Sequence, residues 1–229
     1  MEIDLNCVSN FEFANGDEAI ILKSSDGSMT LVANTKNDMM IITGNVFMKH
    51  VMFFYRYMFN VYGVNDKHVH IIHLGTGMGY DLLYADKAAA YSQTLSCKLT
   101  GVDNTEFGAM RVATSSFRNP VEFISLDATS YLESVNPNNF RSNSSEDNCV
   151  VLFVDLFCST SMIPIDSVYS QDFWDLIHDK VRPDLICINI GHGSSVRKLI
   201  ENTFACEQID HDFQEANFTI ETYNILEAK

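Results

Sequence analysis

The feature that most constrains the fold is the regular alternation of short apolar runs and longer mixed segments from residue 68 onward. Two of the runs, CVVLFVD (149–155) and LICINI (185–190), are almost continuously hydrophobic, which is typical of strands that helices cover on both faces. A connection between parallel strands needs a crossover, and the intervening segments have the pattern of helices. The alternation therefore predicts an α/β fold with a doubly wound, mostly parallel sheet.

The elements of this region follow from hydrophobic period and turn signals. The last two strands have no helix between them, so they are expected to form an antiparallel hairpin at one edge of the sheet. The polar segment 136–148 is expected to be a surface loop. The pattern predicts strands over 68–74, 98–103, 121–127, 149–157, 185–191, 206–213 and 217–226, and helices over 80–93, 105–117, 128–135, 170–181 and 195–204.

The N-terminal part has a different pattern. Three short apolar runs (19–25, 28–34 and 39–45) are separated by turn signals and predict a small antiparallel meander. Residues 46–62 are apolar or aromatic on all sides, which is typical of a buried helix. We therefore divide the chain into residues 1–62, a β-meander plus helix, and residues 63–229, the α/β domain.

Charge and composition narrow the range of partners. With 30 acidic and 15 basic residues, the formal net charge is −15, so the chain lacks the basic footprint that nucleic acids require. The same charge suits a cationic acceptor, such as a polyamine or a basic protein tail. No apolar run reaches about 18 residues, the N-terminus is acidic and polar, and the six cysteines form no C-x-x-C pair. We expect a cytoplasmic protein with reduced thiols and no membrane contact.

The segment HVHIIHLGTGMGY (68–80) has two interpretations, a metal site or a strand that leads into a ligand-binding turn. Side chains alternate between the faces of a strand, so His68 and His70 share one face and His73 points to the other. No nearby carboxylate or cysteine completes a ligand set, so no metal site is predicted.

The glycines favour the second interpretation. Gly75, Gly77 and Gly79 come directly after a strand and directly before a helix, where backbone N–H groups can face a nucleotide or an amino-acid tail. Glycine allows close approach and turn geometries that a Cβ would forbid. A tight turn without any ligand has the same pattern of glycines, so the glycines alone do not establish a ligand-binding turn.

Three consecutive strands end in aspartate: Asp103, Asp127 and Asp155. The carboxyl ends of parallel strands meet at one edge of a sheet, where ligands of this architecture bind. There Asp103 could accept the ribose hydroxyls, Asp127 could accept the adenine amino group, and Asp155 would lie over the same crevice. The alternative is that each aspartate only caps the helix that follows it.

Residues 67–193 resemble the spermidine-synthase-like branch of the class I S-adenosylmethionine-dependent methyltransferase superfamily. The resemblance is carried by KHVHIIHLGTGMG, LTGVDN, VEFISLDATSYL and the stretch from VVLFVDLF to LICINIG. In the last stretch, the branch has an acid-ended strand, a proline loop, an aromatic-rich helix and a second proline. The matching residues are Asp155, Pro164, Tyr169, Phe173, Trp174, Leu176 and Pro183.

The resemblance implies a Rossmann-like, seven-stranded sheet with an antiparallel C-terminal edge. It implies S-adenosylmethionine or its decarboxylated form as the bound co-substrate, with Asp155 as the catalytic residue, and a homodimer contact through the N-terminal β-region. The residues expected to bind the cofactor are His73, Gly75, Thr76, Gly77, Gly79, Asp103, Asn104, Asp127, Ala128 and Asp155.

Several positions depart from the branch. Met78 and Cys158 stand where spermidine synthases have aspartates, which disfavours binding of a dicationic amine. His73 stands where methyltransferases usually have an acid before the glycine turn, and its neutral ring could still accept one hydrogen bond. We expect methyl transfer to an unidentified small-molecule or basic protein acceptor. Aminopropyl transfer of the spermidine-synthase type and an inactive binding or scaffold protein remain alternatives.

Overall fold

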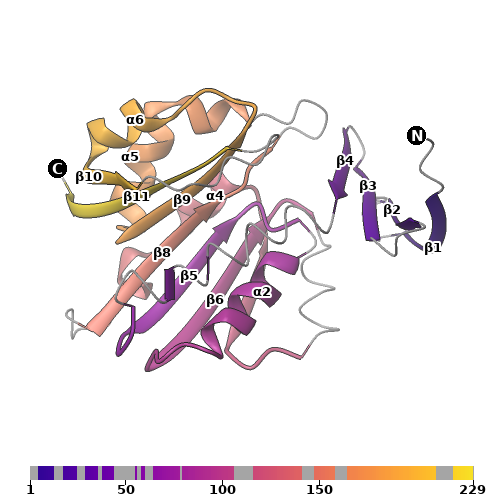
Figure 1. Cartoon of the computed structure of the whole chain (residues 1–229). Coiled ribbons are helices and arrows are strands. Elements are labelled where there is room, and N and C mark those ends of the chain that lie inside the picture. The colour runs from indigo at the N-terminus through magenta and orange to yellow at the C-terminus, as the bar shows by residue number, and fades with distance from the viewer. Residues whose placement is uncertain are drawn as a thin grey trace.

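The protein is seen here in a computed structural model (Figure 1). It describes residues 5–12, 18–24, 29–35, 38–43, 55, 58–59, 64–77, 79–105, 116–140, 147–157, 164–209 and 219–228. For the first four of these ranges, only the backbone is considered.

The N-terminal ranges form a four-stranded antiparallel sheet in the order β1-β2-β3-β4. The three runs expected to be strands are confirmed, and β1 is an additional strand that the sequence pattern did not reveal. Its sequence, LNCVSNFE, lacks a clean polar–apolar alternation, and its pairing with β2 is shifted between Cys7 and Ser9. The strands are β1 (Leu5–Glu12), β2 (Glu18–Ser24), β3 (Met29–Thr35) and β4 (Asp38–Thr43).

The larger sheet has seven strands in the order β10-β11-β9-β8-β5-β6-β7. Neighbours from β9 to β7 are parallel, whereas β11 pairs antiparallel with both β9 and β10, which confirms the predicted hairpin edge. Its strands are β5 (His68–Leu74), β6 (Ser96–Asp103), β7 (Val121–Ser125), β8 (Asn148–Val154), β9 (Leu185–Gly191), β10 (Phe204–Ile209) and β11 (Thr219–Ala228).

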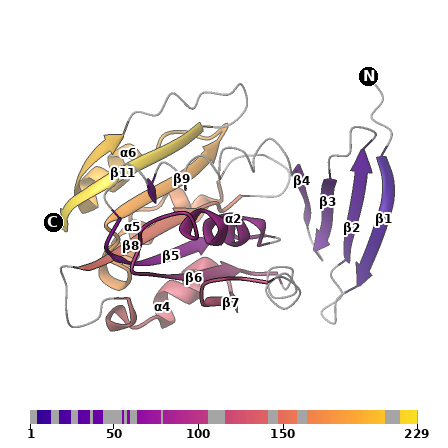
Figure 2. The same cartoon turned by 60° about the horizontal axis from the view of Figure 1, so that its bottom comes forward.

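Helices cover both faces of this sheet, with α2 on one face and α4 on the opposite one (Figure 2). Leu82 of α2 packs in a cluster with Ile71 of β5, whereas Trp174 of α5 packs in a second cluster with Ile72. Alternate residues of β5 thus belong to different cores, as a doubly wound sheet requires. The helices are α2 (Tyr80–Ala89), α4 (Ala128–Ser134), α5 (Gln171–Lys180) and α6 (Arg197–Thr203), with short 3₁₀ turns η1 (Pro137–Asn139) and η3 (Asp166–Tyr169).

The buried helix expected over 46–62 lies mostly outside the described residues, as does that expected over 105–117. Tyr55, Met58 and Phe59 are described, are helical and are fully buried in the α2-side cluster. Cys158, Met78 and the segment 48–50 also lie outside the described residues.

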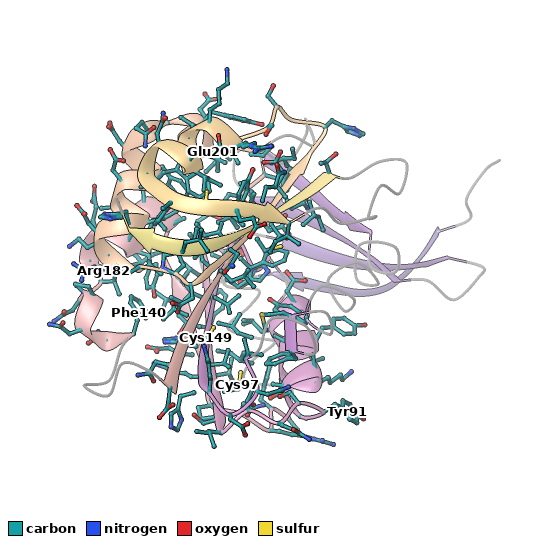
Figure 3. The ribbon with its side chains drawn as sticks, turned by 60° about the vertical axis from the view of Figure 1, so that its left-hand side comes forward. Tyr91, Cys97, Phe140, Cys149, Arg182 and Glu201 are labelled. Carbon is teal, nitrogen blue, oxygen red and sulfur yellow. The ribbon has the colours of Figure 1, made fainter. Side chains whose placement is uncertain are left out.

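The described cysteines are free thiols, and Figure 3 labels two of them, Cys97 of β6 and Cys149 of β8, both buried at the sheet. Burial raises the pKa of Cys97 to about 12, so this thiol is unreactive at neutral pH. Within the described ranges, no helix has both the length and the apolar character needed to cross a membrane.

Candidate functional site

The site is built where β5, β6 and β8 end, because these parallel neighbours present their carboxyl ends at one edge. The turn after β5 carries Gly75, Gly77 and Gly79, with φ of 84°, 48° and 68°, in the left-handed region that favours glycine. A Cβ on Gly75 would overlap the carbonyl oxygen of Asp155. The close approach of the ends of β5 and β8 is therefore sufficient by itself to require glycine at position 75.

Gly79 is the N-cap of α2, and no side chain caps that helix. The first-turn N–H groups of α2 thus have no capping side chain among the described residues, and the helix begins directly at the glycine turn. This arrangement is the one that favours anions and carboxylates at a helix N-terminus. It fits the predicted role of the turn in holding an amino-acid tail.

Asp103 ends β6 and clamps the glycine turn. Its Oδ2 accepts the N–H of Gly77 at 2.7 Å, while its Oδ1 accepts the N–H and the hydroxyl of Thr105 at 2.9 and 2.6 Å. A carboxylate has about four acceptor positions, so the bonds from described residues leave one on Oδ2. Asp103 can accept one ribose hydroxyl as it stands, and accepting both would require one present bond to open.

Asp155 follows β8 and is held by two neighbouring strands. Its N–H donates to Leu74 O at 2.8 Å, and its Oδ1 accepts Asn189 Nδ2 of β9 at 3.0 Å. Asn189 Oδ1 accepts the N–H of Gly191 at 3.0 Å, which fixes the amide with its donor toward the carboxylate. Asp155 is thus held in one orientation, and within the described part of the chain no hydrogen bond to its Oδ2 is present.

Burial, against the hydrogen bond from Asn189 and with a smaller contribution from the charge of Asp103, raises the pKa of Asp155 to about 7. Burial also raises the pKa of Asp103, against the hydrogen bonds from Thr105 and Gly77. A carboxyl group that is half protonated near neutral pH can act as a general base and can also release its proton.

Asp127 lies two residues after the end of β7, the outermost parallel strand, rather than at its end as predicted, and it is exposed. Its Oδ1 accepts the N–H of Ser130 at 2.9 Å, so it is the N-cap of α4. Hydrogen bonding from the side chain of Ser130, and then from its N–H, lowers the pKa of Asp127. Asp127 thus caps the helix that follows it, which was the alternative to a ligand contact. Its contact with adenine stays a prediction. Of its predicted companions, Ala128 is buried at the start of α4 and Asn104 is exposed after β6.

His73 is fully buried, stacked on Phe153 at 4.4 Å, with Nε2 at 3.4 Å from Asp81 Oδ2. Burial lowers its pKa to about 3, so the ring is neutral at physiological pH. Neither ring nitrogen has a hydrogen-bond partner among the described residues, and the same is true of the Thr76 hydroxyl. Their predicted contact with the ligand stays a prediction, but unsatisfied polar atoms at this position need an explanation.

Asp81 is the residue that sequence reasoning missed. It lies in the first turn of α2, is 5% exposed, and approaches the ring of His73. Burial raises its pKa well above the usual range, and the charges of Asp155 and Asp103 add to this. We refer to Asp81, Asp103 and Asp155 as the acidic cluster. The only sequence signal was an acid two residues after the third glycine.

The other two histidines do not belong to the site. His68 Nδ1 bonds Ser96 Oγ at 2.7 Å, and His70 Nε2 bonds Thr100 Oγ1 at 2.9 Å while its ring packs near Phe140. Both rings are therefore bonded between β5 and β6. Among the residues with described placement, no group of three or more His, Cys, Asp or Glu side chains could hold a metal ion.

The chain is similar to known proteins in its three-dimensional structure, but searches by sequence find no match. No protein-family model matches the chain, and no curated protein is similar to it in sequence. The crystal structure of MNMC2 from Aquifex aeolicus superposes with a TM-score of 0.53 and 17% identity over 91% of this chain and 70% of that one.

A putative class I S-adenosylmethionine-dependent methyltransferase from Listeria monocytogenes superposes with a TM-score of 0.51 and 14% identity. That alignment covers 84% of this chain and 62% of the Listeria protein, so this chain spans less than two thirds of it. At such identities the likeness concerns the fold alone. The chain therefore has the Rossmann-like fold seen in a class I S-adenosylmethionine-dependent methyltransferase, and the narrower spermidine-synthase-like branch stays a prediction.

Proposed function

We propose that the chain binds S-adenosylmethionine at the carboxyl edge of its large sheet and transfers the methyl group to a nucleophile beside Asp155. The observation that carries the proposal is the convergence of three strand ends. Asp103 bonds the glycine turn through Gly77, and Asp155 packs against the same turn through Gly75. A helix cap by itself would need neither contact.

The residues present fit this cofactor. The uncapped start of α2 suits its carboxylate, the remaining acceptor position of Asp103 suits a ribose hydroxyl, and the acidic cluster suits its positive charges. When bound, the cofactor supplies a methyl group already activated by the sulfonium. The chain then has to hold an acceptor in line and at contact distance, which provides much of the rate.

Asp155 would take the proton that the acceptor loses. Its pKa of about 7 places it where a base is effective at neutral pH, and Asn189 fixes the carboxylate in one orientation. The acceptor itself is proposed only by class, as a small molecule or a basic protein segment, because the net charge of −15 attracts cations. Aminopropyl transfer from the decarboxylated cofactor is the alternative within the same site.

Thermal unfolding with added ligands tests the proposal. S-adenosylmethionine at 100 times its Kd should stabilise the protein by about 2.7 kcal/mol, and NAD should give no shift. Asp103→Asn should reduce the shift, while Glu122→Gln, an exposed carboxylate paired with Lys98, should leave it unchanged. A larger shift with the decarboxylated cofactor would favour aminopropyl transfer. No shift with any adenosyl compound would contradict the proposal in favour of a scaffold role.

A further inference from the structure

The buried polar groups behind the glycine turn are rich in acceptors and poor in donors. Asp81, Asp103 and Asp155 contribute carboxylates, and among the described residues the only ion pair to any of them is the one between Asp81 and His73. His73 is neutral at physiological pH, so it does not compensate the charge. Burial and the neighbouring Asp155 and Asp103 raise the pKa of Asp81, so its carboxyl favours the neutral form until a cationic ligand supplies the compensating charge.

Two nearby side chains point to the kind of partner. The His73 ring nitrogens and the Thr76 hydroxyl are buried without hydrogen-bond partners in the described part of the chain, at 0% and 3% exposure. His73 Nε2 is directed at Asp81 Oδ2, 3.4 Å away. A positively charged group with several N–H donors would satisfy the acceptor nitrogen of His73, the Thr76 oxygen and the Asp81 carboxylate together. A primary ammonium has three such donors, whereas a sulfonium has none.

We infer that Asp81 is a cofactor-binding residue that accepts the ammonium group of the amino-acid end of the ligand, with His73 and Thr76 beside it. The inference deepens the proposed function and rests on it. Asp81 follows the glycine turn directly, in the first turn of α2. The carboxylate and ammonium of one amino-acid tail would then meet the helix N-terminus and Asp81 together.

Three adenosyl ligands separate this role from others. S-adenosylmethionine has both ammonium and sulfonium, S-adenosylhomocysteine has the ammonium alone, and methylthioadenosine has neither. Isothermal titration of the full chain should show that Asp81→Asn weakens binding of the first two ligands at least tenfold. Binding of methylthioadenosine should change less than twofold, because it has no amino-acid tail.

Asp86→Asn is the matched control. Asp86 is a second buried aspartate of α2, 2% exposed, but its carboxylate bonds the N–H groups of Arg118 and Asn119. Asp86→Asn should leave the affinity ratio of S-adenosylmethionine to methylthioadenosine unchanged within twofold. Thermal unfolding without ligand confirms that each variant is folded.

The outcomes separate the two proposals. Binding of S-adenosylmethionine but not of NAD by the unaltered chain supports the proposed function, whatever Asp81 does. Equal weakening of all three ligands by Asp81→Asn would overturn the ammonium contact in favour of a structural role. Weakening of S-adenosylmethionine alone would overturn it in favour of a sulfonium contact. Failure of the unaltered chain to bind any adenosyl ligand would overturn both proposals.

Discussion

At the residue scale, Asp155 illustrates a conflict between stability and activity. Its pKa is about 7 in the folded protein against about 4 in an unfolded chain, so the folded state binds the proton more tightly. By linkage, this residue's contribution to the free energy of unfolding is present at low pH and lost as pH rises from about 4 through 7. The acid is thus retained at a cost to the unliganded protein.

Asp155→Asn should raise the free energy of unfolding above pH 7.5 by about 1 to 2 kcal/mol, because the half-buried carboxylate loses its charge while the amide oxygen can still accept from Asn189. Near pH 4 the difference between variant and unaltered chain should vanish. Urea unfolding at both pH values measures it. A constant difference across pH would show that packing, not charge, is responsible.

Gly75→Ala and Gly101→Ala should differ in severity, although both glycines are tightly enclosed. At Gly75 the new methyl meets the Asp155 carbonyl and φ is +84°, so we expect a loss of about 3 kcal/mol or more. At Gly101 the nearest atom is the flexible Leu82 Cδ1 at 2.6 Å, so about 1 to 2 kcal/mol is expected. Equal losses in denaturant unfolding would contradict this reading of the turn.

At the element scale, the strands of the large sheet were predictable, whereas their contacts were not. Continuous apolar runs such as 185–191 mark a buried strand by composition alone, and β9 matches that range. By contrast, α2 ends at Ala89 rather than at residue 93, since the chain turns there with Ser92 bonded to Ala89. Propensity does not reveal such a tertiary turn.

The candidate site divides in the same way. Placing Asp103 and Asp155 at one edge required only that parallel strands end together. The approach of Asp81 to His73 and the bond from Asn189 to Asp155 depend on helix position and strand order, which periodicity does not determine. The sequence therefore predicted the positions of the glycine turn, Asp103 and Asp155, and it missed Asp81, the third member of the acidic cluster.

Asp127 allows the two interpretations of an acid at a strand end to be separated. Asp127→Ala should cost about 1 kcal/mol through loss of the α4 cap, while Asp127→Ser should retain most of the capping energy. If Asp127 also binds adenine, both variants should weaken S-adenosylmethionine binding equally, as measured by titration. If only the alanine variant binds more weakly, the residue acts through the helix alone.

At the scale of the whole molecule, a known fold is formed by a sequence that matches no family model and no curated protein. The structural likeness exists at 14% and 17% identity and without any matching family model. This is expected because apolar core residues of similar volume can replace one another without changing the sheet. Oligomeric state and the predicted division at residues 62 and 63 stay predictions. The buried aromatic segment before that division provides a test.

A fragment of residues 63–229 should be much less stable than one of residues 44–229. Tyr55, Met58 and Phe59 are 0–1% exposed in the α2-side core, and each buried side chain of this size contributes about 1.5 to 3 kcal/mol. Urea unfolding of the two fragments compares them directly. Similar midpoints would support the division at 62 and 63, with the helix belonging to the N-terminal part.

The main chains at Gly75 and Asp155 approach so closely that a Cβ on Gly75 would overlap the Asp155 carbonyl, so the glycine turn and the residue proposed as base are packed directly against each other. A displacement of the glycine turn must therefore also shift Asp155. Occupancy of the glycine turn would then set the base in position before an acceptor arrives. If the proposed methyl transfer takes place, we therefore predict ordered addition, in which the adenosyl compound binds first and its product leaves last.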